Sequence, residues 1–81
     1  MPYIAAALRH HAEHTPLNAG ELNFALTRML LGYIERKGLS YQTINDCVGA
    51  LECAKLEAYA RIARPYEQDK CAANGEVYFP A

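Results

Sequence analysis

Polar side chains interrupt the apolar face of the helix expected over residues 41–64, and they are the best candidates for ligand chemistry. When this segment is set at about 100° per residue, Lys55 falls near the middle of a wide apolar arc, and Asn45 and Glu52 fall inside its edge. A charge or an amide in such a position must be paired, reach water along its own stem, or bind something. Amide and carboxylate groups can read the edge of a base, and a lysine can face a phosphate.

A second set of polar side chains lies in the helix expected over residues 19–37. Asn23 and Thr27 are one turn apart inside its apolar arc, and Arg28 belongs to the narrow polar strip on the other side. Tyrosine rings near both sets can stack on a base. We therefore expect a polar pocket between subunits that binds a nucleotide without a phosphate loop. Its expected residues are Asn23, Thr27, Arg28, Tyr33, Tyr41, Asn45, Glu52, Lys55 and Tyr59.

The same polar residues admit a structural interpretation. Glu52 and Lys55 are i, i+3 neighbours on a helix, so they can simply pair with each other. A satisfied polar network can also fix helix register or oligomeric state while adding little stability. The sequence leaves both interpretations open.

Catalytic arrangements are not evident. The sequence has no G-x-S-x-G, no P-loop, no H-E-x-x-H and no glycine-rich turn after a strand. Cys47 and Cys53 point to different helix faces, and helical cysteines in apolar arcs are usually inert packing. Glu52 and Glu57 also point in different directions and make a poor carboxylate pair. We expect a protein that is not an enzyme and needs no cofactor.

The histidine-rich segment near the N-terminus contains two potential metal ligands at helical spacing. His10 and His14 are i, i+4 neighbours, so both can face one metal ion. Zinc needs further ligands, and the nearby Glu13 is expected on another face of the helix. The sequence therefore predicts no metal site, and the segment is interpreted as an exposed helix end.

Length and composition exclude several classes of protein. Eighty-one residues predict one domain with a marginal core. A net charge of -1 without a clustered basic surface argues against DNA or RNA as partners. No apolar run approaches the ~20 residues of a membrane span, and the N-terminus does not resemble a signal peptide. The three cysteines are odd in number and form no C-x-x-C pair, so free thiols and a cytoplasmic location are expected.

Capping signals set the expected helix boundaries. Asn18 and Glu21 form a capping box, and Gly38 ends the helix that they begin. Ser40 caps the next helix, and Pro65 either kinks it or begins a new one. The expected helices cover residues about 3–14, 19–37, 41–64 and 65–73, and an extended tail follows at residues 76–81.

A very short link at Leu39 joins the two longest helices, which favours an antiparallel hairpin. Their apolar arcs are too wide for the two helices to hide against each other. A second copy of the chain is the most economical cover. The predicted fold is an all-α antiparallel helical hairpin with short flanking helices, assembled as a symmetric homo-oligomer.

Six sequence blocks, in a fixed order, carry a resemblance to a known family. They are MPYI at residues 1–4, GELNFALTR at 20–28, YQTIND at 41–46, GALECAKLE at 49–57, PYE at 65–67 and NGEVY at 74–78. The chain resembles a family of short proteins of unknown function carried by tailed phages and prophages. The family brings no established activity. The resemblance implies a phage accessory protein in the host bacterial cytoplasm, and small proteins of that class often block host enzymes or immune signalling.

Together, the polar set, the expected oligomer and the resemblance lead to one functional hypothesis. The chain is expected to be a non-enzymatic binding protein that counters host defence by sequestering a small signalling nucleotide. The alternative is a protein–protein interaction module that inhibits or adapts a host protein through the wide apolar surface. A structural or regulatory phage accessory without a ligand is the third possibility.

Overall fold

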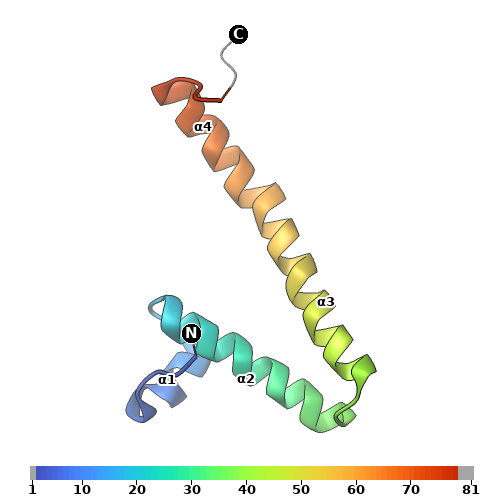
Figure 1. Ribbon diagram of the computed structural model, residues 1–81. Coiled ribbons are helices and arrows are strands. Elements are labelled where there is room, and N and C mark those ends of the chain that lie inside the picture. The colour runs from blue at the N-terminus through green and yellow to red at the C-terminus, as the bar shows by residue number, and fades with distance from the viewer. Residues whose placement is uncertain (1, 79–81) are drawn as a thin grey trace. The chain divides into compact units, whose positions relative to one another are not determined.

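The structure is a computed structural model that describes residues 2–78, and these residues form helices and turns without a strand. In chain order the elements are η1 (Ala6–Leu8), α1 (Arg9–His14), α2 (Ala19–Lys37), α3 (Tyr41–Ala58), the π-helical segment η2 (Tyr59–Ala63) and α4 (Arg64–Asn74) (Figure 1). The all-α prediction is confirmed. Part of the predicted tail, residues 79–81, lies outside the described residues.

The chain divides into two compact units, Met1–Cys47 and Val48–Ala81, called here the N-terminal unit and the C-terminal unit. The division falls inside α3. In the N-terminal unit, α1 packs on α2. Ala12 of α1 is fully buried, and Phe24 of α2 is only 9% exposed. None of the described residues of the C-terminal unit is buried.

The N-terminus is less helical than the sequence predicts. A helix was expected from residue 3, but Ala5 has extended backbone angles and the first helical turn, η1, begins at Ala6. Ile4 donates its backbone N–H to the carbonyl of Pro2, and its own carbonyl accepts a hydrogen bond from Arg9 Nε at 3.2 Å. These local bonds hold the segment in a folded-back, non-helical form that the alanine-rich composition does not reveal.

The start of α2 is fixed by a buried carboxylate. Asn18 Oδ1 accepts from the backbone N–H of Glu21 at 2.9 Å, as in the expected capping box. Glu21 is 5% exposed, and its oxygens accept from the backbone N–H of Leu17 and from Asn18 Nδ2, both at 3.2 Å. His11 Nε2 of α1 also lies 3.1 Å from the Glu21 carboxylate. This network joins α1 to the first turn of α2.

The turn from α2 to α3 uses a glycine and two hydroxyl groups. Gly38 has a φ of 88°, and its N–H donates to the carbonyl of Ile34. Ser40 Oγ accepts from the backbone N–H of Thr43 at 3.1 Å, which caps α3. The buried Thr43 hydroxyl donates to the carbonyl of Gly38 at 2.8 Å. The short link is therefore closed by its own hydrogen bonds.

The helix expected over residues 41–64 is α-helical only as far as Ala58, and the π-helical segment η2 continues it to Ala63. Pro65 has no N–H to donate to the carbonyl four residues before it. In the π-helical turn, the N–H of Arg64 instead donates to the carbonyl of Tyr59, five residues back. Pro65 then sits in the first turn of α4, where a proline is tolerated. The helical segment continues through the proline, but the backbone hydrogen bonds just before it span five residues where an α-helix spans four.

Most large apolar side chains of the two main helices are exposed. Among them are Met29 of α2 and Val48 of α3, at 72% and 61% exposure. None of the described helices combines the length and the apolar character that crossing a membrane requires. The apolar arcs noted in the sequence are thus left without a cover in the described part of a single chain.

Candidate functional site

A shallow hollow of about 300 Å³ lies on the N-terminal unit. It is formed where the start of the chain meets α1 and α2. A neighbouring hollow of about 260 Å³ shares Arg9, Phe24 and Arg28 with it. The first hollow is lined by Pro2, Tyr3, Arg9, Phe24, Thr27, Arg28 and Leu31.

Arg9 is held in place by its surroundings. Its Nε donates to the carbonyl of Ile4 at 3.2 Å, and its guanidinium lies 5.8 Å from the centroid of the Phe24 ring. A cation over an aromatic face is attracted by the negative charge density of the ring. Arg9 is also the first residue of α1, so its position follows that of the short helix. The remaining guanidinium N–H groups are available to an anion.

Arg28 reaches from α2 to α1. Its Nε donates to Glu13 Oε1 at 2.6 Å. This hydrogen bond lowers the pKa of Glu13 below its ordinary value and raises the pKa of Arg28. Both groups are therefore charged at neutral pH. Because the Arg28 side chain is half exposed, the pair orients the guanidinium more than it stabilises the fold.

The aromatic residues of the hollow differ in exposure. Tyr3 is 80% exposed, whereas Phe24 is buried under Arg9. An exposed ring beside two guanidinium groups is a combination that can stack on a base and contact a phosphate. The hollow can therefore bind a small planar anion, and its lining side chains offer two guanidinium groups and the hydroxyl groups of Tyr3 and Thr27.

Several of the residues predicted for the site lie in the N-terminal unit. Thr27 and Arg28 line the hollow. Asn23 lies one turn before Thr27, whose hydroxyl donates to the Asn23 carbonyl at 2.8 Å. Thr27 Oγ1 also lies 3.4 Å from Asn23 Oδ1. The two polar residues of α2 that were expected in one pocket thus bond to each other.

Tyr33 has a structural partner. Its hydroxyl donates to Asp46 Oδ2 at 2.8 Å, and Gln42 Nε2 donates to Asp46 Oδ1 at 2.8 Å. The hydrogen bond raises the pKa of Tyr33, and the two donors lower the pKa of Asp46. Tyr41 and Asn45 lie one turn apart on the first turns of α3 and are exposed.

The remaining predicted site residues lie in the C-terminal unit. Lys55 Nζ is 3.1 Å from Glu52 Oε1, and both side chains are more than half exposed. Tyr59 begins η2 and is 57% exposed. Because the predicted residues are divided among two units, neither unit contains the whole set. The pairing of Glu52 with Lys55 agrees with the structural interpretation of these residues.

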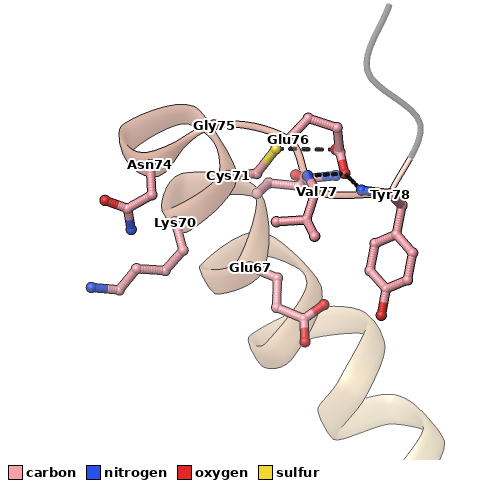
Figure 2. A pocket seen from close by; sticks show the side chains of 9 residues that line it. Glu67, Lys70, Cys71, Asn74, Gly75, Glu76, Val77 and Tyr78 are labelled. Atoms are coloured by element: carbon pink, nitrogen blue, oxygen red, sulfur yellow. Dashed lines mark hydrogen bonds between the residues drawn. The ribbon is translucent and has the colours of Figure 1, made fainter.

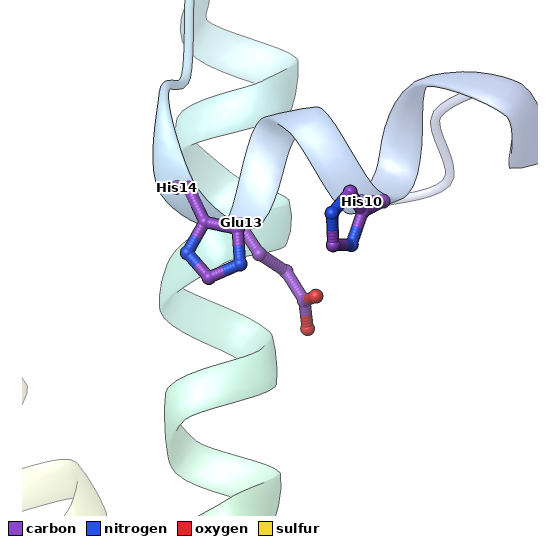
Figure 3. A group of neighbouring side chains, drawn as sticks. All are labelled: His10, Glu13 and His14. Atoms are coloured by element: carbon purple, nitrogen blue, oxygen red, sulfur yellow. The ribbon is translucent and has the colours of Figure 1, made fainter.

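The histidine-rich segment corrects one expectation. The sequence predicts Glu13 on another face of the helix from His10 and His14, but potential ligand atoms of all three lie within 4.8 Å of one another. Figure 3 shows the three side chains on one side of α1. Around a helix Glu13 lies about 60° from His10 and about 100° from His14. Its flexible side chain nevertheless brings the carboxylate toward both rings (Figure 3).

A larger hollow, of about 450 Å³, lies where the residues after α4 turn back on the helix (Figure 2). Glu76 organises it, accepting at Oε1 from the backbone N–H groups of Val77 and Tyr78 at 2.9 and 2.8 Å. The Cys71 thiol donates to Glu76 Oε2 at 3.2 Å. This bond to a carboxylate raises the pKa of Cys71. The pKa of Glu76 is lowered, mainly by the hydrogen bond from the backbone N–H of Tyr78. The thiol is protonated at neutral pH and a weak nucleophile.

Sequence reasoning missed Tyr3, Arg9 and Phe24. Tyr3 and Phe24 fall in blocks that carry the family resemblance, which could have drawn attention to them. Phe24 lies one turn before Arg28 on α2. The approach of Tyr3 and Arg9 to Arg28 depends instead on how the start of the chain and α1 pack on α2, and no periodicity within a single helix contains that information.

The comparisons with known proteins give one finding. A family model described as a domain of unknown function (DUF6899) matches residues 1–77. Comparison with curated proteins and with solved structures gave no match.

Proposed function

The chain belongs to the DUF6899 family, a family of unknown function, and from this starting point we propose that it is a non-enzymatic protein that sequesters a small signalling nucleotide. The observation that carries this proposal is the hollow containing Arg9, Arg28 and the exposed ring of Tyr3. Guanidinium groups bind phosphate through two hydrogen bonds at a time, and a tyrosine ring stacks on any base. Thr27 adds a hydroxyl that can donate or accept.

The biological setting belongs to the same proposal. The protein is encoded by a phage, acts in the bacterial cytoplasm and lowers the free concentration of a nucleotide that signals infection. The resemblance of its sequence blocks to short phage proteins supports this setting.

The proposed working form is a symmetric homo-oligomer of antiparallel helical hairpins. The exposed apolar side chains of α2 and α3 support assembly, because a single described chain leaves them open to water. The hollow holds little more than about 300 Å³, the lower end of the range for ligand pockets. A second copy placed over it would deepen the pocket. The polar side chains of Asn45, Glu52 and Lys55 are the proposed contribution from neighbouring copies.

The test is a titration of the purified protein with a panel of cyclic and linear signalling nucleotides, followed by thermal unfolding. A nucleotide at about 100 times its Kd stabilises the native state by about 2.7 kcal/mol. Any bound nucleotide is then recovered by denaturing the protein, and its mass should be unchanged. An altered mass would mean that the protein is an enzyme.

Matched variants locate the binding site. Arg9→Ala should abolish the thermal shift, whereas Arg64→Ala, which removes an arginine outside the hollow, should preserve it. Lys55→Ala tests whether a neighbouring copy contributes, and it should weaken binding without changing the oligomeric state. Absence of a shift for every nucleotide in the panel would overturn the proposal.

A second candidate function is docking of a host protein. It is favoured by the exposed apolar residues of the C-terminal unit, among them Val48, Leu56 and Ile62. Pull-down from host lysate compares the wild-type protein with Val48→Glu. The oligomeric state and nucleotide binding of both proteins are measured alongside, because the same face is proposed to join copies of the chain. A host protein that is captured by the wild type and lost with Val48→Glu, without any nucleotide effect, would favour docking.

A further inference from the structure

Three potential metal ligands converge on the exposed side of α1. His10, Glu13 and His14 occupy positions i, i+3 and i+4, and their potential ligand atoms all lie within 4.8 Å of one another. The imidazole rings of His10 and His14 are 5.4 Å apart between centroids and meet edge to face. Both histidines are exposed, and Glu13 is partly exposed, so an ion can reach all three from solvent.

We propose that His10, Glu13 and His14 form a site for a divalent transition-metal ion, with Zn²⁺ as the best match. Two imidazole nitrogens and one carboxylate oxygen are a ligand set that zinc accepts, and they leave a fourth position open. Magnesium and calcium prefer oxygen ligands, so they fit this set poorly. The open position accepts water or a group supplied by another molecule.

The spacing of the ligand atoms is compatible with zinc after small side-chain rotations. At metal–ligand distances of about 2.0–2.2 Å and tetrahedral angles, two ligand atoms on one zinc ion lie roughly 3.3–3.6 Å apart. The ligand atoms now lie up to 4.8 Å apart, so they have to approach one another by a little more than 1 Å. Exposed histidine side chains rotate easily on this scale, and α1 itself does not have to move.

Arg28 holds the Glu13 carboxylate in place through a hydrogen bond. Its Nε donates to Oε1 of Glu13, so Oε2 is the oxygen left to coordinate a metal. Ligating carboxylates in metal sites are commonly held by such hydrogen bonds from other residues.

The order of these residues is H-x-x-E-H, which also occurs in one class of zinc peptidase. There the glutamate acts as a base beside a substrate cleft. Here the glutamate is bonded to Arg28, and the adjoining hollow of about 260 Å³ is shallow. We assign the site to metal binding and not to peptide hydrolysis.

The experiment uses full-length protein without a histidine tag, stripped of metal and kept reduced. Zn²⁺ alone is titrated in competition with a chromogenic chelator. One ion per chain is expected for the wild type. His10→Ala and His14→Ala should each weaken binding about tenfold or more, since loss of a supporting residue alone costs 10–100-fold.

His11→Ala is the matched control, because His11 lies between the two ligands in sequence but faces Glu21 of α2. It should retain zinc binding. Circular dichroism of each metal-free variant checks that the helices are intact. Binding that is unchanged in His10→Ala and His14→Ala would overturn the proposal.

Cysteine binding of zinc is the main competing explanation, since Cys53 and Cys71 are at least partly accessible. Cobalt(II) separates the two, because thiolate ligands give an intense charge-transfer absorption that nitrogen and oxygen ligands lack. The cobalt complex of the wild type should show only weak d–d bands. A thiolate band that disappears in Cys53→Ser or Cys71→Ser would assign the metal to cysteine and contradict the site on α1. This readout does not depend on whether any histidine variant folds.

Discussion

At the scale of single residues, Glu76 is the hydrogen-bond partner of the Cys71 thiol. The carboxylate accepts a hydrogen bond from the thiol and raises its pKa, because a thiolate beside a carboxylate is disfavoured. Glu76→Gln removes that charge, so the thiolate fraction should increase and Cys71 should be alkylated several-fold faster at pH 7. Iodoacetamide labelling followed by mass spectrometry measures the rate at each cysteine.

Cys53 is the internal control for this prediction, because it is exposed on α3 and has no contact with Glu76. Its alkylation rate should be the same in both proteins. A faster rate at both cysteines would point to general loosening of the C-terminal unit. An unchanged rate at Cys71 would show that Glu76 does not hold the thiol protonated.

The cap of α2 is a second feature of single residues. Asn18 Oδ1 accepts from the Glu21 N–H, and replacing such a cap by alanine typically costs about 1 kcal/mol. We expect Asn18→Ala to lower the free energy of unfolding by about that amount. Urea denaturation followed by circular dichroism measures it. Ser40→Ala, at the equivalent position of α3, should have a similar effect.

At the scale of elements, the Tyr33–Asp46 hydrogen bond links α2 to the first turns of α3. The pKa of Asp46 is lowered below its ordinary value of 3.8, so its contribution to stability is present above that pH and is lost as pH falls through the lowered value. The pKa of Tyr33 is raised above 10.0, so its contribution is present below that pH and is lost as pH rises through the raised value.

The difference in unfolding free energy between the wild type and Tyr33→Phe should therefore be constant near neutral pH and shrink at both extremes. Chemical denaturation across the pH range measures this difference. Tyr41→Phe is the control, since Tyr41 is 87% exposed and should give little difference at any pH. A difference that did not vary with pH would mean that the hydrogen bond contributes nothing to stability.

The π-helical segment before Pro65 is another feature of element scale. A residue with a backbone N–H at position 65 should let the chain form ordinary α-helical hydrogen bonds between residues i and i+4, because the proline prevents them. We expect Pro65→Ala to convert η2 to α-helix and to raise helix stability, by as much as about 3 kcal/mol if the present turn carries the full cost of a helical proline.

Hydrogen exchange and Cα chemical shifts of residues 59–64 measure that conversion. The control is Pro16→Ala, which changes a proline that lies before α2 and outside any helix. It should leave the exchange of these residues unchanged. A π-helical signature that survived Pro65→Ala would indicate that side-chain packing, and not the missing N–H, causes it.

Local signals in the sequence predicted the elements better than they predicted their arrangement. The ends of α2 and the start of α3 lie at the predicted capping residues, which are Asn18 with Glu21, Gly38 and Ser40. These ends were predictable because capping depends on a few adjacent residues. The start of α1 and the π-helical turn were missed. The start of α1 depends on the hydrogen bond from the Arg9 side chain to the Ile4 carbonyl, which forms only when the chain folds. The π-helical turn depends on which carbonyl accepts from the N–H of Arg64 just before Pro65, and the residue types around the proline do not specify that choice.

The candidate site shows the same limit. Thr27 and Arg28 were identified because they are polar positions on one helix, and they do line the hollow. Arg9 and Tyr3 were not identified, because their place beside Arg28 requires the packing of α1 on α2. Asn45, Glu52 and Lys55 stay a prediction about neighbouring copies of the chain.

At the scale of the whole molecule, the exposed apolar surface is the feature that most affects the free energy of unfolding. Burying a Val, Leu or Ile side chain contributes about 1.5–3 kcal/mol, and many such side chains are exposed in the described chain. A small domain with so little buried core is marginal unless another molecule covers that surface. The proposed homo-oligomer supplies this cover.

Val48 and Ala50 of α3 provide a matched test of that oligomer. Both are exposed in the single chain, and on an α-helix they lie about 200° apart, so they point to opposite sides. Val48 belongs to the apolar arc and Ala50 does not. A glutamate at position 48 would have to lose its hydration in an assembled interface, which is strongly unfavourable without a partner charge. Val48→Glu should therefore sediment as a monomer of reduced thermal stability, whereas Ala50→Glu should keep the mass and stability of the wild type. Sedimentation equilibrium over a range of concentrations gives both masses, and a wild-type protein that is monomeric throughout would remove the oligomer from the proposed function.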